Sequence, residues 1–227
     1  MTSGYVPAQP VSRRRWVELA AVSGMAGAVL FVAAFTIQAW MYPGYSWTGM
    51  FVSELSLGPR GWIQILNFLL TGALILVFGR GLRACLNAGA ASLAGPLLVQ
   101  CLGVCLMVSG PYTTDPSAFS GPPTAHGLVH GVFGALFFTL APVCCFVFYR
   151  RFRSDPAWRP LAGWTLTAGV LLSLGIIVLK ISQQPGTGLF EWKGLVQRIL
   201  LVTIMAWIFA VAFRLRTISR PTVGPAY

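Results

Sequence analysis

The chain has 227 residues, of which 56% are hydrophobic and 9% charged, and its formal net charge is +11. Soluble domains carry about 25% charged residues. The composition therefore excludes a soluble enzyme, a disordered chain and a small disulfide scaffold. The basic excess suggests nucleic acid only if the basic residues share a water-exposed face, so their positions along the chain decide its meaning.

Apolar segments long enough to cross a membrane recur along the whole chain. A hydrocarbon core of about 30 Å needs roughly 20 apolar helical residues. The segments that meet this requirement, or nearly do, are 17–40, 61–79, 92–109, 126–149, 161–180 and 194–215. We therefore expect an all-α polytopic membrane protein: one bundle of six transmembrane helices over residues 17–215, with tails at 1–16 and 216–227.

The basic residues are divided unequally between the two sides of this bundle. An even number of spans puts both termini on one side, and that side receives twelve of the sixteen Lys and Arg residues. The positive-inside rule makes it the cytoplasmic side. The charge is thus a topology signal, which predicts membrane lipids as partners and no nucleic acid. The ratio of 14 Arg to 2 Lys suggests a bacterial source, and the expected location is the bacterial plasma membrane.

The remaining polar residues collect on the opposite, extracytoplasmic side. Three of the five acidic residues, both lysines and both histidines belong to this group. Acid, base and hydrogen-bonding groups together are what a reactive or binding site requires. We take as catalytic candidates Glu54, Asp115, His126 and His130, and as substrate-binding candidates Lys180 and Arg198.

The histidines at positions 126 and 130 form the sharpest local pattern. Spacing i, i+4 places both imidazoles on one helical face, as in H-E-x-x-H zinc sites, although Gly127 replaces the glutamate that serves as base there. Asp115 is the best third ligand, followed by Glu54 and Glu191, and two histidines with one carboxylate suit zinc or non-haem iron. The alternative is that His126 caps the helix mouth and His130 hydrogen-bonds a neighbouring helix.

Two further features concern the loop at 41–60 and the last helix. The loop is rich in aromatic residues, so it either folds back as a lid or lies in the headgroup layer as an interfacial segment. Arg198 lies about one turn inside the last helix, and it either pairs with a carboxylate among Glu54, Asp115 and Glu191 or extends to the interface. Lys180, at the end of the fifth helix, has the same two alternatives: together with Arg198 it orients an anionic head group, or it extends to the interface.

Several of these residues together resemble a known family over about residues 25–215. They are Ser53-Glu54-Leu55, Trp62, Asn67, Gly72, Asp115, Thr124-x-His126-Gly127-x-x-His130 and Gln197-Arg198. This combination is similar to the prokaryotic six-helix membrane family called domain of unknown function 998. The resemblance implies a fold but no activity, so no functional role is carried over. A looser similarity is to ceramidase-like membrane hydrolases, which hold zinc with histidines, whereas this chain has only two.

Three functions stay open from the sequence. The first is metal-assisted hydrolysis or transfer on a lipid-like substrate, with a divalent metal such as zinc held by Asp115, His126 and His130 and lowering the pKa of a bound water. The second is non-catalytic binding of a lipid or small molecule at the outer face. The third is a structural role beside a protein partner in a membrane assembly.

Overall fold

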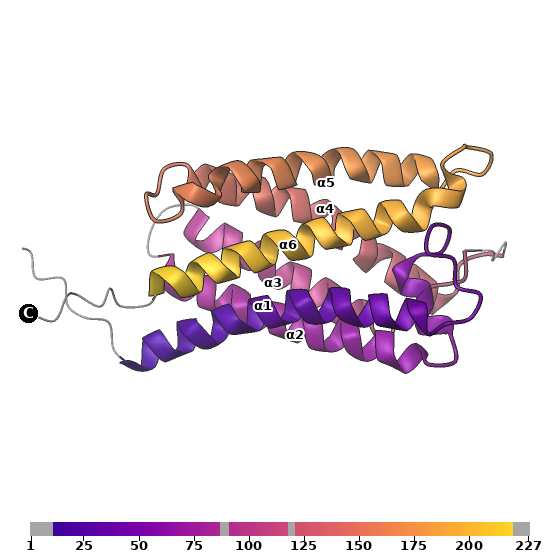
Figure 1. The fold of residues 1–227 in the computed structure, drawn as a ribbon, viewed down its shortest axis with the longest axis horizontal. Coiled ribbons are helices and arrows are strands. Elements are labelled where there is room, and N and C mark those ends of the chain that lie inside the picture. Colours follow the sequence, from indigo (N-terminus) through magenta and orange to yellow (C-terminus); the bar gives the residue numbers. More distant parts are fainter. Residues whose placement is uncertain (1–10, 87–90, 118–120, 220–227) are drawn as a thin grey trace, which may run out of the picture.

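The computed structural model describes residues 11–86, 91–117 and 121–219, which form an elongated bundle of helices along one common axis (Figure 1). The long helices are α1 (Val11–Trp40), α2 (Gly61–Cys85), α3 (Ala91–Ser109), α4 (Ala125–Phe152), α5 (Ala162–Ser182) and α6 (Lys193–Ser219). The short 3-10 helices are η1 (Val52–Leu57), η2 (Arg159–Leu161) and η3 (Phe190–Trp192). No strand occurs in these ranges, which confirms the predicted all-α fold class.

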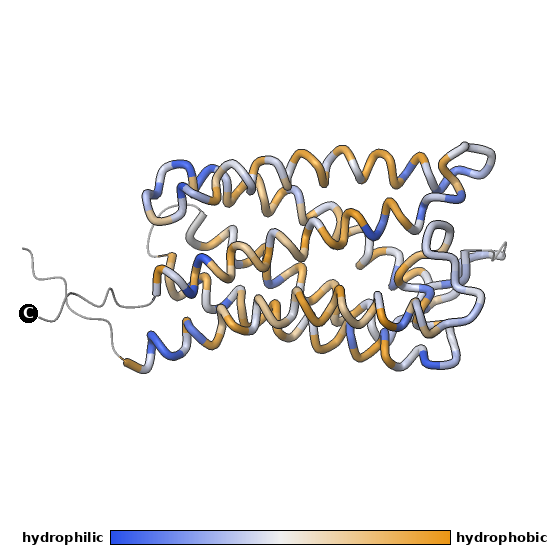
Figure 2. The backbone as a smooth tube through the Cα atoms, in the orientation of Figure 1, coloured by the Kyte–Doolittle hydropathy of each residue, from blue (hydrophilic) through white to orange (hydrophobic). Residues whose placement is uncertain are grey.

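All of the long helices except α3 are long and apolar enough to cross a membrane. Helix α3 has 19 residues, and at 1.5 Å per residue it extends roughly 28 Å, close to the thickness of the hydrocarbon core. Apolar residues cover the middle of the bundle, and the polar ones concentrate toward its two ends (Figure 2). The chain is therefore a multi-pass membrane protein.

Each long helix packs on the next one along the chain, and α1 also packs on α6, which closes the bundle. Glycines permit the closest approaches. A Cβ at Gly24 would overlap the ring of Phe78, and one at Gly72 would overlap the backbone of Gly103 on α3. Small residues at such positions let helix backbones approach one another within a membrane.

The helices extend beyond the apolar segments from which they were predicted. Helix α1 begins at Val11 rather than near residue 17, and α6 continues to Ser219. The added turns contain arginines, which lower the hydropathy of a segment but favour helix formation. Arg13 in the first turn of α1 donates a hydrogen bond to the carbonyl of Ala84 at the end of α2. Hydropathy thus marks the apolar part of each helix and not its ends.

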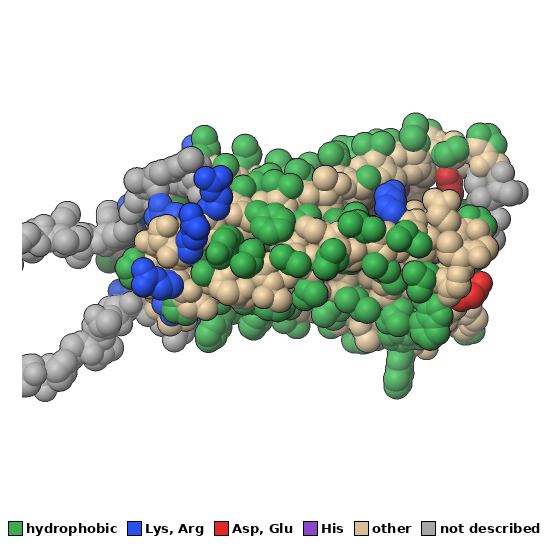
Figure 3. All heavy atoms as spheres, turned by 90° about the horizontal axis from the view of Figure 1, so that it is seen from above, with side chains coloured by type: hydrophobic (Ala, Val, Ile, Leu, Met, Phe, Trp, Pro, Cys, Tyr) green, Lys and Arg blue, Asp and Glu red, His purple; other side chains and the backbone are tan. Residues whose placement is uncertain are grey.

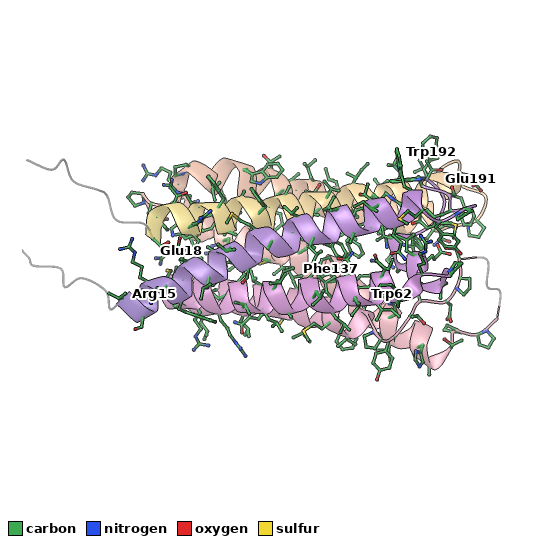
Figure 4. All side chains as sticks on the ribbon, turned by 60° about the horizontal axis from the view of Figure 1, so that its bottom comes forward. Arg15, Glu18, Trp62, Phe137, Glu191 and Trp192 are labelled. Atoms are coloured by element: carbon green, nitrogen blue, oxygen red, sulfur yellow. The ribbon has the colours of Figure 1, made fainter. Side chains whose placement is uncertain are left out.

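The two ends of the bundle differ in chemistry. Lys and Arg side chains gather at the end where α1 begins and α6 finishes, and hydrophobic side chains cover the middle (Figure 3). Arg15 and Glu18 lie at this end, whereas Trp62, Glu191 and Trp192 lie at the other (Figure 4). We call the first the arginine-rich end, and we call the second, which carries the 41–60 loop and the 110–117 segment, the site end.

Candidate functional site

The loop at residues 41–60 folds back onto the site end of the bundle, as the lid interpretation predicted. Its η1 segment buries Val52, Ser53, Glu54 and Leu55. The loop is joined to α6 by two hydrogen bonds: the Leu195 amide donates to the Thr48 carbonyl at 3.0 Å, and the Val52 amide donates to the side-chain Oε1 of Gln197 at 2.7 Å. The loop therefore forms part of the site wall.

Arg198 holds this loop by contacts with backbone and aromatic groups. Its Nη1 donates to the carbonyls of Trp47 at 2.6 Å, Met50 at 3.1 Å and Gly194 at 3.1 Å, and its Nη2 donates to the hydroxyl of Tyr45. The guanidinium carbon lies 5.2 Å from the ring centre of Tyr45 and 5.3 Å from that of Trp47. No carboxylate pairs with Arg198 among the described residues, so the predicted ion pair is replaced by carbonyl and cation–π contacts.

Tyr45 completes this arrangement from inside the loop. Its hydroxyl donates to the Phe51 carbonyl at 2.8 Å and accepts from Arg198. Burial raises the pKa of Tyr45 to about 12, although the nearby Arg198 charge lowers it. The phenol therefore stays protonated at neutral pH, which it must do in order to donate to a carbonyl.

Glu54 links two connections at the site end. It is only 3% exposed. Its Oε2 accepts from the Phe51 amide at 2.7 Å and from the Ser117 hydroxyl at 2.7 Å, and its Oε1 accepts from the Ser117 amide at 2.8 Å. Both carboxylate oxygens thus have protein donors, and the side chain holds the 110–117 segment against η1.

Asp115 caps the start of α4. Its Oδ2 accepts from the Thr124 amide at 3.0 Å, and its Oδ1 accepts from the Thr124 hydroxyl at 2.7 Å. The Thr124 hydroxyl oxygen in turn accepts from the Gly127 amide at 3.0 Å, as an N-cap residue does. A Cβ at position 127 would overlap the Asp115 carboxylate, which explains why glycine follows His126.

The two histidines lie in different surroundings. His126 is exposed, and its ring centre is 5.4 Å from that of Tyr112. His130 is partly buried, with Nδ1 at 2.8 Å from the Tyr112 carbonyl and 3.1 Å from the Ser109 carbonyl. Two carbonyl neighbours require Nδ1 to carry the proton, so Nε2 is the acceptor of the neutral ring. This contact to the end of α3 agrees with the alternative interpretation of His130.

The predicted metal ligands do not come together as a set. Within the described ranges no group of three His, Cys, Asp or Glu side chains is placed to hold a metal ion. Both oxygens of Asp115 already accept hydrogen bonds from Thr124. A zinc site normally takes three or four protein ligands, so these residues do not fit one.

A cavity of about 290 Å³ lies at the site end and contains His130 and Lys180. Its polar lining comes from Ser53, Ser109, Thr114, His130, Thr139, Lys180, Gln183 and Gln197. Its apolar lining includes Phe51, Phe68, Leu106, Phe137, Phe138, Leu179 and Leu201. The cavity therefore combines groups from η1 and from α2 to α6, with Phe137 in the bundle interior (Figure 4). Glu54, Asp115, His126 and Arg198 do not line it.

Several polar groups of this cavity have no protein partner within the part of the chain that the structure describes. Lys180 is exposed and forms no ion pair there. Within the same ranges, the Gln183 side chain and Nε2 of His130 form no hydrogen bond. Oε1 of Gln197, in contrast, accepts a hydrogen bond from the Val52 amide. The cavity thus offers one cation, amide donors and one imidazole acceptor.

Two glycines of α4 leave the cavity open. A Cβ at Gly131 or Gly134 would have no heavy atom within 4 Å, and both residues line the cavity. Lining residues of α4 and α5 such as Gly131, Ala135 and Lys180 are exposed, so the mouth lies on the α4–α5 side. Neither glycine was predicted to belong to the site, although both continue the histidine pattern in His126-Gly-x-x-His130-Gly-x-x-Gly.

Comparison with known proteins identifies the family of this chain. No curated protein and no solved structure matches the chain. One family model does, and its match covers residues 25–214, which include the loop, the α4 cap and the cavity. The chain belongs to the family described as "Protein of unknown function (DUF998)".

Proposed function

We propose that this protein binds a small anionic amphipathic molecule, of lipid-like build, in the His130–Lys180 cavity. The observation that carries the proposal is the Lys180 ammonium, which forms no ion pair with any described residue, at a cavity whose other wall is aromatic and aliphatic. Ligand sites commonly consist of an apolar lining and a few polar groups that fix orientation. A carboxylate or phosphate would contact Lys180 and the amide groups, and the apolar part would contact Phe68, Phe137 and Leu201.

The proposed topology is six spans, with α3 as the shortest, and both termini in the cytoplasm. The arginine-rich end supports this orientation through the positive-inside rule. The site end, with its mixed charges and its cavity, then faces the extracytoplasmic side of the plasma membrane. A ligand from the outer leaflet or the surrounding water would reach the cavity at its α4–α5 mouth.

Binding is favoured over hydrolysis or transfer by the state of the carboxylates. Glu54 and Asp115 both accept hydrogen bonds from neighbouring amides and hydroxyls, and neither lines the cavity. His130 therefore has no carboxylate partner there, and its Nε2 serves best as an acceptor for a hydroxyl or an acid proton of the ligand.

The test uses the purified full chain in an amphipol, with decanoate and decanol as probes. Lys180→Gln should weaken decanoate binding by about tenfold, because one charge-assisted hydrogen bond contributes about that much to affinity. Decanol binding should remain unchanged. Gly134→Leu should abolish binding of both probes because its side chain fills the cavity. Gly163→Leu, at an exposed position of α5 where a Cβ meets nothing, is the control.

Thermal unfolding of each variant shows that it is folded. Undiminished decanoate binding by a folded Gly134→Leu variant would overturn the proposal. Equal binding of decanoate and decanol, unaffected by Lys180→Gln, would show that the cavity does not select an anionic ligand.

A further inference from the structure

A second cavity, of about 220 Å³, lies at the site end and shares no lining residue with the His130–Lys180 cavity. It is formed where the end of α1 and the 41–60 loop meet the start of α2. Its lining residues are Gln38, Met41, Tyr42, Pro43, Gly58, Pro59, Arg60 and Ile63. The polar members of this set, Gln38, Tyr42 and Arg60, determine what it can bind.

Gln38 brings to this cavity a buried hydrogen-bond acceptor, its side-chain oxygen. The side chain is 4% exposed. Its Nε2 donates to the Leu55 carbonyl at 3.1 Å and to the Arg60 carbonyl at 3.0 Å. These two acceptors fix the orientation of the amide, since a flipped oxygen would face two carbonyl oxygens. Oε1 is then left without a donor among the described residues, and buried acceptors normally have one.

Arg60 and Tyr42 supply complementary groups on the same cavity. Arg60 is exposed, and its guanidinium has no hydrogen bond or ion pair within the described ranges. The Tyr42 ring stacks on Tyr45 with 5.7 Å between ring centres, and a Cβ at Gly58 would overlap it. The ring is therefore fixed by packing, and its hydroxyl has no hydrogen-bond partner among the residues that the structure describes. The cavity thus combines a guanidinium and a phenol hydroxyl, which suit an anion, with the amide oxygen of Gln38, which suits a hydrogen-bond donor.

The position of the cavity points to the headgroup layer. Trp40 and Trp62 next to it in sequence are 83% and 61% exposed, and Trp62 lies at the site end (Figure 4). Exposed tryptophans of membrane proteins concentrate at the level of the lipid headgroups. The exposed Met41 adds an apolar surface beside the cavity.

We propose that this second cavity binds a phosphate ester whose head carries a hydrogen-bond donor, supplied by a phospholipid of the adjacent leaflet. The phosphate contacts the Arg60 guanidinium and the Tyr42 hydroxyl. An ammonium or hydroxyl of the head donates to Oε1 of Gln38. A trimethylated choline head lacks such a donor, so the cavity discriminates phosphatidylethanolamine and phosphatidylglycerol from phosphatidylcholine.

The test is native mass spectrometry of the delipidated full chain with each lipid added singly. Phosphatidylethanolamine should bind about tenfold more tightly than phosphatidylcholine, the worth of one hydrogen bond to a buried acceptor. Arg60→Gln should weaken its binding by about tenfold, and Tyr42→Phe by a smaller factor. Arg80→Gln, at an exposed position near the other end of α2, and Tyr112→Phe, in the 110–117 segment, are the matched controls.

A second experiment with soluble phosphate compounds distinguishes a phospholipid ligand from a water-borne phosphate ester. Phosphoethanolamine without acyl chains that binds as tightly as the lipid, in an Arg60-dependent way, supports the same site with a water-borne ester as its ligand. Weak binding of phosphoethanolamine and of inorganic phosphate supports the lipid. Equal binding of the ethanolamine and choline lipids, or full binding by folded Arg60→Gln, overturns the proposal.

Discussion

The carboxylate of Asp115 occupies the space that a side chain at position 127 would need, so the cap of α4 depends on Gly127. Asp115 binds Thr124 through both oxygens, and Thr124 binds the Gly127 amide. The start of α4 also places His130 in the cavity. Glycine between the two histidines is therefore a requirement of the helix cap, and it does not mark a metal site that has lost its glutamate.

Gly127→Ala should destabilise the protein by about 1–2 kcal/mol, because the added methyl displaces Asp115 and weakens the N-cap. In a chain of this size that corresponds to a Tm lower by roughly 2–8 °C. Gly131→Ala is the control: its methyl meets nothing, so better helix propensity should hold or raise the Tm. Equal Tm values for the two variants in detergent would contradict this account of position 127.

The Arg198–Tyr45 contact should be measurable as a coupling energy. Tyr45→Phe removes the hydroxyl, and Arg198→Gln removes the guanidinium that binds it and the carbonyls of Trp47 and Met50. A hydrogen bond to a charged group contributes about 1.5–3 kcal/mol, so Arg198→Gln should cost at least about 2 kcal/mol. The double variant should lose less than the sum of the single losses. Strict additivity would show that the two residues act independently.

Tyr45 also predicts a loss of stability at high pH. Its pKa is raised from the ordinary value of 10.0 to about 12 in the folded protein. The protonated phenol therefore stabilises the fold fully below pH 10, and this contribution of about 2–3 kcal/mol disappears as the pH rises from 10 to 12. Unfolding curves at several pH values should show a steeper decline for the wild type than for Tyr45→Phe. Tyr112→Phe should decline as the wild type does.

The sequence predicted the coarse architecture because hydropathy is a local property. Apolar segments gave the helices. The gathering of polar residues at one end indicated where a site would lie, and a cavity lined by His130 and Lys180 is found at that end. The partners of Arg198 could not be predicted, since they depend on how the 41–60 loop returns to α6. A charged residue in a membrane helix suggests a carboxylate, but carbonyls of a folded loop satisfy it equally well.

Gln38 illustrates the same limit for a neutral residue. It lies in an apolar segment, and nothing in its neighbours distinguishes it from a glutamine that bridges two helices. Its role follows from the return of Leu55 and Arg60 to the end of α1, which positions two carbonyls at its Nε2. Long-range contacts of this kind are set by loop geometry, and a single sequence carries no record of them.

The metal hypothesis has a direct test in elemental analysis of protein purified without added metal or chelator. The arrangement of Asp115, His126 and His130 predicts substoichiometric zinc and iron, unchanged in His130→Ala. The same samples after incubation with zinc and desalting should also retain less than one equivalent. One equivalent of metal in the wild type that is lost in His130→Ala would restore the three-ligand site and with it metal-assisted chemistry.

Glu54 should matter for the fold of the site end and only indirectly for the ligand. All three of its hydrogen-bond partners are donors: two amides and the Ser117 hydroxyl. In Glu54→Gln the new amide nitrogen must face at least one of them, which should destabilise the protein by about 1–3 kcal/mol. Ser117→Ala should lose part of this stability, and Glu191→Gln, at an exposed position, should lose none.

Decanoate binding by folded Glu54→Gln should remain within about threefold of the wild type. Complete loss of binding without loss of stability would instead show that Glu54 contacts the ligand itself.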